Sequence, residues 1–194
     1  MLRLLLRPIV LLLLLCVGIL TGACTPESMR SLPDEQRVAA DSRLIGTWHT
    51  QVLGNDHVAV VTAGAAGTLD VVLRTRPASG GGDGVETRHL LAFYDIDGTR
   101  VIVERGPGLV DRQPTYRFAA YDVAPGGAVT LRYASQLEFL RWVMPLRLSA
   151  DVRSPDPMFR DLMLTASSEN LLTVLRSKKP DVMFDVVFGP FVRQ

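Results

Sequence analysis

Histidine and cysteine are the residues most able to hold a metal or to act as nucleophiles, and this sequence has few of either. None of the three histidines, His49, His57 and His89, lies at metal-ligand spacing from another. The two cysteines, Cys16 and Cys24, both lie near the N-terminus. We therefore expect no bound metal and no cofactor, and we expect the histidines at surface or hairpin positions.

Asp95 and Asp97 could begin a calcium-binding loop, but that loop needs Gly at its sixth position and Glu at its twelfth. Arg100 and Gly106 stand there instead. Asp97-Gly98 is better explained as a two-residue hairpin turn. No Gly-x-Ser-x-Gly motif occurs, and the glycine run at 80–82 lacks the Gly-Lys-Ser/Thr ending of a phosphate-binding loop. The sequence thus predicts no catalytic residues and a protein that is not an enzyme.

The composition excludes two broad classes of protein. The 194 residues include 21 Lys and Arg against 20 Asp and Glu, a net charge of +1, which leaves no basic surplus for binding nucleic acid. With 47% hydrophobic residues, the chain is also too apolar to be disordered over most of its length. A folded globular protein remains, without nucleic acid among its expected partners.

The first 24 residues have the layout of a secretory signal. Arg3 and Arg7 precede an apolar run at 9–20, and three small residues at 21–23 precede Cys24. This stretch resembles a bacterial lipoprotein signal, in which the cysteine is diacylated, for example with palmitate, and becomes the mature N-terminus. An uncleaved signal anchor and a plain signal peptide are the alternatives.

The resemblance implies that residues 1–23 are removed and that Cys24 carries the lipid. The 171 residues that remain would hold no second cysteine, so no disulfide is expected. Because Thr25 rather than Asp follows the cysteine, the resemblance implies the outer membrane, with the protein facing the periplasm. The membrane would be a partner through the N-terminal lipid, and no protein partner is indicated.

Residues 24–43 are expected to carry the lipid and to tether it flexibly to the folded domain. This stretch contains prolines and scattered charges but no sustained apolar periodicity. A short helix over Asp34–Ala40 is the alternative. The folded domain would then extend from Leu44 to the C-terminus at residue 194.

From Leu44 the chain alternates apolar and polar residues between turn residues, a pattern that predicts antiparallel strands. The expected strands are Leu44–Leu53, His57–Thr62, Thr68–Arg76, Glu86–Asp95, Arg100–Arg105, Thr115–Val123 and Val129–Ala134. Strands at this regular spacing suggest a barrel or a sandwich, and consecutive hairpins favour an up-and-down meander.

The last third of the chain is mixed. Short helices are expected over Ser135–Met144 and Leu171–Lys178. Strands are expected over Asp161–Thr165 and Phe184–Val192, the second with a break or bulge at its Gly-Pro dipeptide. The predicted fold is therefore mainly β, an antiparallel up-and-down barrel with one or two short helices in the C-terminal third.

A Gly-x-Trp triplet, Gly46-Thr47-Trp48, opens the first strand. This opening resembles that of lipocalins and the wider calycin barrels, and the stretches 117–121 and 164–184 are similar to bacterial lipocalin-like lipoproteins. The resemblance implies that residues 44–194 form a lipocalin-like barrel in which Trp48 plugs one end and Arg193 lies across its ring. Gly46 would allow close backbone approach where the chain enters the barrel. The resemblance implies no particular activity.

A barrel of eight strands has room for packed side chains or for one small ligand. One hypothesis is a lipid-anchored envelope protein that binds a small apolar ligand. The residues expected to line the ligand site are Val60, Val71, Phe93, Val103, Phe118 and Leu131. The other hypothesis is a structural or interaction protein of the envelope whose barrel core is filled. The volume of the cavity separates the two, because typical ligand pockets measure about 300–1,000 Å³.

Overall fold

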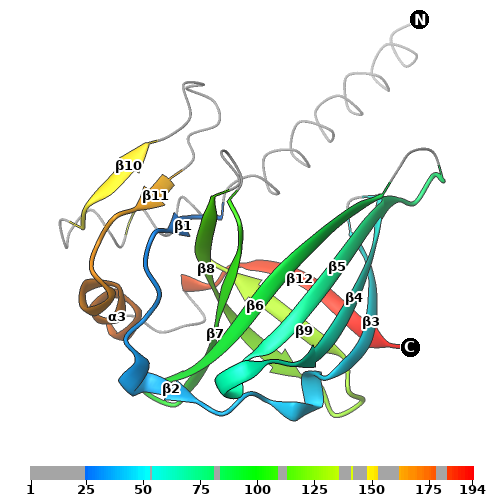
Figure 1. Cartoon of the computed structure of the whole chain (residues 1–194), viewed down its shortest axis with the longest axis horizontal. Helices are drawn as coiled ribbons and strands as arrows, with labels where there is room; N and C mark the ends of the chain where they lie inside the picture. The colour runs from blue at the N-terminus through cyan, green and yellow to red at the C-terminus, as the bar shows by residue number, and fades with distance from the viewer. Residues whose placement is uncertain are drawn as a thin grey trace, which may run out of the picture.

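The computed structural model describes residues 25–52, 54–80, 84–108, 113–135, 141, 148–152, 162–177 and 183–194. Within these residues the fold is mainly β, and eight antiparallel strands form the closed barrel that the sequence predicts (Figure 1). The barrel strands are β3 (Gly46–Val52), β4 (Asn55–Ala63), β5 (Leu69–Pro77), β6 (Val85–Ile96), β7 (Thr99–Pro107), β8 (Pro114–Val123), β9 (Val129–Tyr133) and β12 (Val186–Arg193).

Pairing around the barrel follows the order of the chain until the last strand. Each strand from β3 to β9 pairs with the next, and β12 then pairs with β9 on one side and β3 on the other. The seven strands expected between Leu44 and Ala134 are confirmed as one meander, and their ends differ from the prediction by no more than two residues. Closure therefore depends on a strand about fifty residues further along the chain.

The turn between β6 and β7 has the predicted hairpin register. Ile96 pairs with Thr99, and Asp95 pairs with Arg100. Asp97 and Gly98 both have positive φ, 52° and 84°, as a type I′ turn requires. The Asp95 carboxylate accepts a hydrogen bond from the amide of Gly98 at 2.8 Å, so it caps the turn.

Two apolar clusters on opposite sides of the barrel wall form the core. The inner cluster lies inside the barrel and includes Trp48, Leu69 and Phe93. The outer cluster includes Val103 and Phe118 and lies between β6–β8 and the C-terminal elements. Strand β7 contributes to both clusters because its apolar run is buried on both faces.

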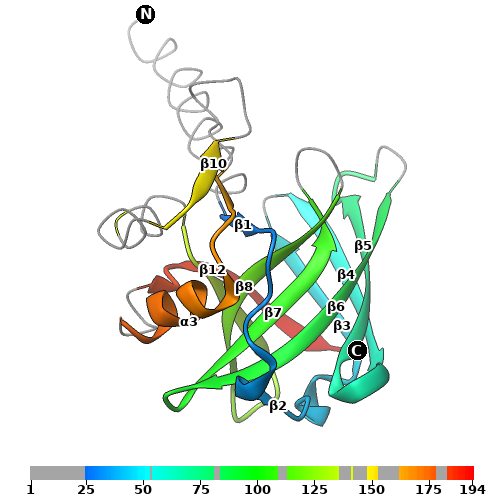
Figure 2. The ribbon, with the colours of Figure 1, turned by 60° about the vertical axis from the view of Figure 1, so that its left-hand side comes forward.

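The C-terminal elements cover one side of the barrel, as Figure 2 shows for α3 (Ser168–Arg176) beside β8. Ser167 caps this helix by accepting a hydrogen bond from the amide of Asn170. Its apolar face is buried in the outer cluster. Strand β11 (Leu162–Leu164), within the predicted strand 161–165, pairs with β10 (Ala150–Val152).

The segment 25–43 packs against the barrel, so the prediction of a flexible tether is wrong for the residues that the structure describes. β1 (Glu27–Ser28) pairs with β11 and β8, and β2 (Arg37–Val38) pairs with β6. The 3₁₀ helix η1 (Asp34–Gln36) lies between them, inside the helix considered as the alternative. Composition misses such a segment because backbone pairing and a few buried side chains hold it without any apolar periodicity.

Several predictions fall outside the described residues. These are the signal segment 1–23, the lipidated Cys24 and most of the helix expected over Ser135–Met144. Within the described residues, no helix is both long enough and apolar enough to cross a membrane.

The packing of segment 25–43 is tested by comparing two of its residues. Leu32 is 3% exposed in the outer cluster, whereas Met29, three residues earlier, is 52% exposed. Leu32→Ala is expected to lower the free energy of unfolding by about 2–4 kcal/mol. Met29→Ala is the matched control and is expected to change it by less than about 0.5 kcal/mol. Equal, small effects in urea unfolding would show that the segment is not docked.

Candidate functional site

A cavity of about 110 Å³ lies inside the barrel. Its wall is almost entirely apolar and is formed by inward-facing residues of all eight strands together with Leu44. The lining residues are Leu44, Trp48, Ala59, Val61, Val71, Leu73, His89, Leu91, Ile102, Glu104, Ala119, Val129, Leu131, Tyr133, Phe188 and Phe191. The cavity is partly open rather than sealed.

The structure brings some of the predicted lining residues to this cavity and not others. Val71 and Leu131 line it, and Phe93 lies in the inner cluster without lining it. Val103 and Phe118 pair across β7 and β8 in the outer cluster. The prediction that these two residues face the interior is wrong. Alternation cannot assign the inner face of a strand that is buried on both sides.

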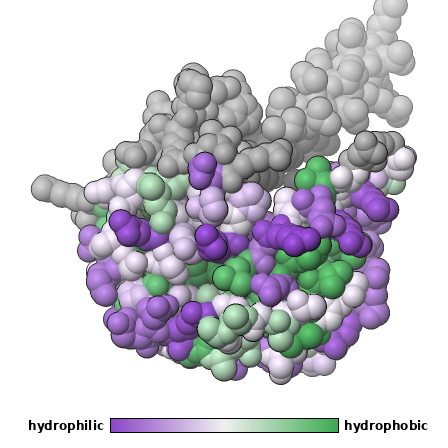
Figure 3. Space-filling model, viewed as in Figure 1, coloured by the Kyte–Doolittle hydropathy of each residue, from purple (hydrophilic) through white to green (hydrophobic). Residues whose placement is uncertain are grey.

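Val60 also stands on the outer face, between the inward Ala59 and Val61, and it pairs with Val72 on β5. Both valines are half-buried. Apolar surface bordered by hydrophilic residues is visible on the side of the barrel that carries β5 and β6 (Figure 3). The prediction that Val60 lines the cavity is therefore wrong. Because the outer face of β4 also carries apolar residues, the sequence does not distinguish Val60 from a residue that lines the cavity.

Trp48 closes one end of the cavity. Its ring is 4% exposed, and its Nε1 donates a hydrogen bond to the carbonyl of Leu44 at 2.7 Å. The guanidinium of Arg193 lies 4.8 Å from the ring centroid, within the range of a cation–π contact. Gly46 has φ +145°, a backbone conformation that residues other than glycine rarely adopt. Glycine is therefore needed here to let the backbone enter β3.

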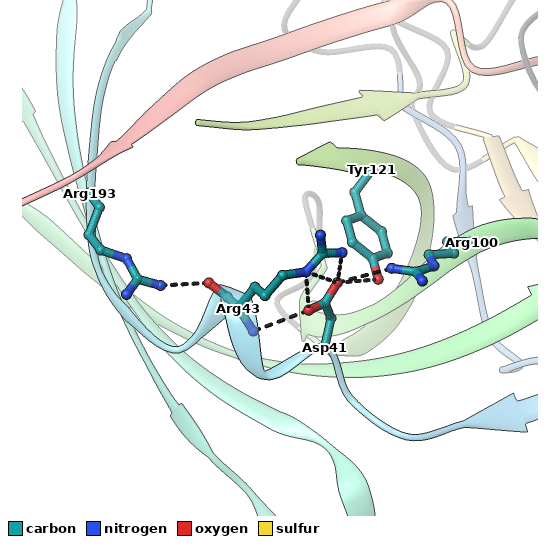
Figure 4. A network of polar contacts seen from close by, with 5 residues as sticks. All are labelled: Asp41, Arg43, Arg100, Tyr121 and Arg193. Atoms are coloured by element: carbon teal, nitrogen blue, oxygen red, sulfur yellow. Dashed lines mark hydrogen bonds and ion pairs between the residues drawn. The ribbon is translucent and has the colours of Figure 1, made fainter. Parts of the chain in front are cut away.

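A network of polar contacts ties the chain around this closed end (Figure 4). Arg193 donates to the carbonyls of Arg43 and Ile45, at 2.6 and 3.0 Å. The Asp41 carboxylate accepts hydrogen bonds from Arg43, Arg100 and Tyr121. Hydrogen bonding from Arg43 lowers the pKa of Asp41 to about 2, against partial burial. These contacts join β12 and η2 (Ser42–Leu44) to β7 and β8 at the end of the barrel that Trp48 closes.

At the other end of the cavity lies a buried polar cluster of four side chains, His89, Glu104, Arg117 and Tyr133, here called the Glu104 cluster. Arg117 Nη2 donates to Glu104 Oε1 at 2.8 Å, and the Tyr133 hydroxyl donates to Oε2 at 2.9 Å. Nδ1 of His89 lies 2.6 Å from Oε1, and its Nε2 lies 2.6 Å from the Thr87 hydroxyl. The side chains of Glu104 and Arg117 are 11% and 15% exposed.

The contacts within the Glu104 cluster keep its carboxyl group ionised. Burial alone would raise the pKa of Glu104, but the contacts with His89 and Arg117 outweigh burial and lower it to about 2. Burial and the Glu104 charge both raise the pKa of Tyr133, so the phenol stays protonated. A buried carboxylate therefore stands in the wall of an otherwise apolar cavity.

Gly106 makes room for the cluster. A Cβ on Gly106 would lie 2.5 Å from Nδ1 of His89 and 3.0 Å from Nη2 of Arg117. Because real Cβ atoms do not approach as closely as 2.5 Å, any larger residue here would displace the His89 ring and crowd the Arg117 guanidinium. The position is fixed by β7, where Glu104 and Gly106 follow Ile102 on the inner face.

The Glu104 cluster was not predicted from the sequence. His89 was expected at a surface or hairpin position, and the structure buries its side chain to 8% exposure. The signal was present in the register, because Glu104 lies two residues after the inward Ile102, and Arg117 lies two before the inward Ala119. A charged residue at an inward position on each of two adjacent strands would have indicated a buried pair.

The other two histidines are not part of this cluster. His57 faces the interior, donates to or accepts from the Thr75 hydroxyl at 3.0 Å, and packs edge-on against Phe188. Burial lowers its pKa. His49 Nε2 lies 3.4 Å from Asp56 Oδ1, and both side chains are more than one third exposed, at 35% and 38%. Among the described residues, no group of three or more His, Cys, Asp or Glu side chains could hold a metal.

Comparison with family models, with curated proteins and with solved structures finds no match to this chain.

The contribution of Glu104 to stability is tested by acid titration. Its pKa is lower in the folded protein than its ordinary value of 4.5, so its stabilisation is present above pH 4.5 and is lost as the pH falls towards 2. Glu104→Gln removes the nearest counter-charge of the buried Arg117 and is expected to cost about 3–5 kcal/mol at neutral pH. The variant should also lose less stability than the wild type between these two pH values.

Glu86→Gln is the matched control for this measurement. Glu86 pairs with Arg74 at 3.0 Å on the exposed face of the barrel, and both side chains are more than 40% exposed. Its loss is expected to cost less than about 1 kcal/mol. Equal costs for the two variants in chemical unfolding would contradict a special role for Glu104.

Proposed function

We propose that the barrel is a binding protein that takes a small apolar molecule into its interior. The observation that carries the proposal is the cavity of about 110 Å³, walled by apolar side chains and partly open. Filling an apolar cavity with an apolar group is favourable because apolar surface leaves water. We propose binding without catalysis, because His89 and Glu104 contact each other and neighbouring side chains.

The volume limits the ligand. A cavity of about 150 Å³ holds a benzene molecule in a protein interior, whereas typical ligand pockets measure about 300–1,000 Å³. At about 110 Å³ the cavity is smaller than that site but partly open, so its ligand would be no larger than one ring or a short alkyl group, either whole or as the buried part of a longer molecule. A filled core with no ligand, in a structural or interaction protein of the envelope, is the competing function.

The proposal extends to the location of the protein. Cys24 would carry lipid, so the barrel would be held at a membrane of the bacterial envelope, with the outer membrane favoured by Thr25. The support is the signal-like pattern of residues 1–24. Only Thr25 and Pro26 separate Cys24 from β1, which pairs with Tyr116 near the start of β8.

This short separation would orient the barrel on the membrane. Tyr116 lies at the end of the barrel where β7 joins β8, opposite the end closed by Trp48 and Arg193. A lipid on Cys24 would therefore hold the end farther from Trp48 nearer to the membrane. An apolar ligand dissolved in the bilayer would then reach the barrel by a short path.

Binding is tested with toluene as the probe and a pair of adjacent substitutions in β4. Ala59 lines the cavity, and Val60 next to it faces outwards. The wild type is expected to bind toluene in calorimetric titration, with heat that disappears in Ala59→Leu because the added methyl groups occupy the cavity. Val60→Leu is the matched control and should bind as the wild type does. No binding to the wild type would favour the filled-core function.

Lipidation is tested in cells that express the full chain. The wild-type protein is expected to incorporate radioactive palmitate, and Cys24→Ala should not, since no other cysteine would remain after removal of residues 1–23. Ser28→Ala would not serve as a control because Ser28 is buried in β1, so Ser31→Ala is used and should be labelled normally. Labelling of the Cys24→Ala protein would refute the anchor.

A further inference from the structure

The Glu104 cluster determines which polar group a ligand of the cavity can carry, and this inference rests on the binding function proposed above. Four of the side chains that line the cavity carry polar atoms: Trp48, His89, Glu104 and Tyr133. The rest of the described lining is apolar. The hydrogen-bonding capacity of the cavity therefore depends on what these four side chains have left to offer.

The donors of these four side chains either form hydrogen bonds or lie in close contact with the Glu104 carboxylate. Trp48 Nε1 donates to the carbonyl of Leu44, and the Tyr133 hydroxyl donates to Glu104. Nδ1 of His89 lies against Glu104 Oε1, and its Nε2 lies against the Thr87 hydroxyl. Arg117 Nε, Thr115 Oγ1 and His89 Nδ1 are buried without a hydrogen bond of good geometry among the described residues. Arg117 and Thr115 do not line the cavity, and His89 Nδ1 lies 2.6 Å from Glu104 Oε1, which leaves no space for a ligand atom between them.

Acceptors remain. Among the described residues, Arg117 and His89 contact Oε1 of Glu104, and Tyr133 contacts Oε2. A carboxylate oxygen has two lone pairs, so Oε2 can accept a second hydrogen bond. The phenolic oxygen of Tyr133 can accept one as well. The polar end of the cavity thus offers acceptors to a ligand.

The charges around the cavity also favour an uncharged ligand. Glu104 lines the cavity as an anion, and its counter-ion Arg117 does not line it. A ligand carboxylate would meet the Glu104 carboxylate in an apolar enclosure, which is the costly arrangement of two like charges. Because Arg117 already neutralises Glu104, a ligand needs no charge of its own.

We infer that the ligand is a neutral molecule with a small apolar body and a hydroxyl group, a phenol or a short alcohol, and that this hydroxyl donates to Glu104. The apolar body occupies the space between Trp48 and Glu104. Carboxylates of the same size, including the head groups of fatty acids, are excluded by Glu104.

The inference is tested with three probes of one ring each: toluene, phenol and benzoate. Phenol and toluene differ by a hydroxyl in place of a methyl group, and water retains phenol more strongly than toluene. A hydrogen bond to a charged acceptor outweighs this difference. Phenol is therefore expected to bind the wild type at least fivefold more tightly than toluene in calorimetric titration at pH 7, and benzoate should show no binding.

Two variants assign the preference to Glu104. The double variant Glu104→Gln with Arg117→Met removes both charges together, so neither is left buried alone, and it should bind toluene more tightly than phenol. Tyr133→Phe removes the other acceptor, keeps the carboxylate and should still prefer phenol. Measuring both keeps the test valid if one variant does not fold.

The outcomes separate this inference from the binding function itself. If neither toluene nor phenol binds the wild type, the binding function fails. If toluene binds as tightly as phenol, or if benzoate binds, the cavity takes apolar molecules but the assigned ligand class is wrong. Loss of the phenol preference in Tyr133→Phe, with its retention in the double variant, would likewise overturn the role of Glu104.

Discussion

The ion pair between Glu104 and Arg117 is the constraint around which the barrel interior is arranged. Its two residues pair directly across β7 and β8, and their contact is buried. A buried charge needs an oppositely charged partner and further hydrogen bonds to offset its desolvation. His89 and Tyr133 supply further contacts to the carboxylate, and Gly106 leaves the space for them. The apolar cavity is bounded by this arrangement on one side.

The opposite boundary of the cavity depends on the closure of the barrel. β12 brings Arg193 over Trp48 and to the carbonyls before β3, so the last strand both completes the sheet and covers its end. Asp41 extends the closure by holding the N-terminal segment to β7 and β8 through Arg100 and Tyr121. The two ends are thus chemically different, one sealed by an aromatic ring and the other bounded by charge. Under the proposed binding function, that asymmetry would give a bound molecule a preferred direction.

The strands were predictable because their alternation and turns are local, as the Asp97-Gly98 hairpin illustrates. The contact of Arg193 with Trp48 was accessible only through a resemblance, since nothing local links residues so far apart. The faces of Val103 and Phe118 were not predictable, because β7 and β8 are covered on both sides by elements distant in the sequence. Segment 25–43 was mistaken for a tether for the same reason: its partners β6, β8 and β11 come later in the chain. The Glu104 cluster takes one residue from each of the strands β6, β7, β8 and β9, and no regular spacing in the sequence links these four residues.

The most direct test of this account is the pKa of Glu104 in the folded protein, measured by NMR titration of its ¹³C-labelled side-chain carboxyl group. A carboxylate held by Arg117, His89 and Tyr133 is predicted to titrate at about 2. It should therefore remain ionised in the cavity wall throughout the neutral range. A pKa above the ordinary value of 4.5 would show that burial dominates and that the cavity is lined by a neutral acid, which would contradict the account.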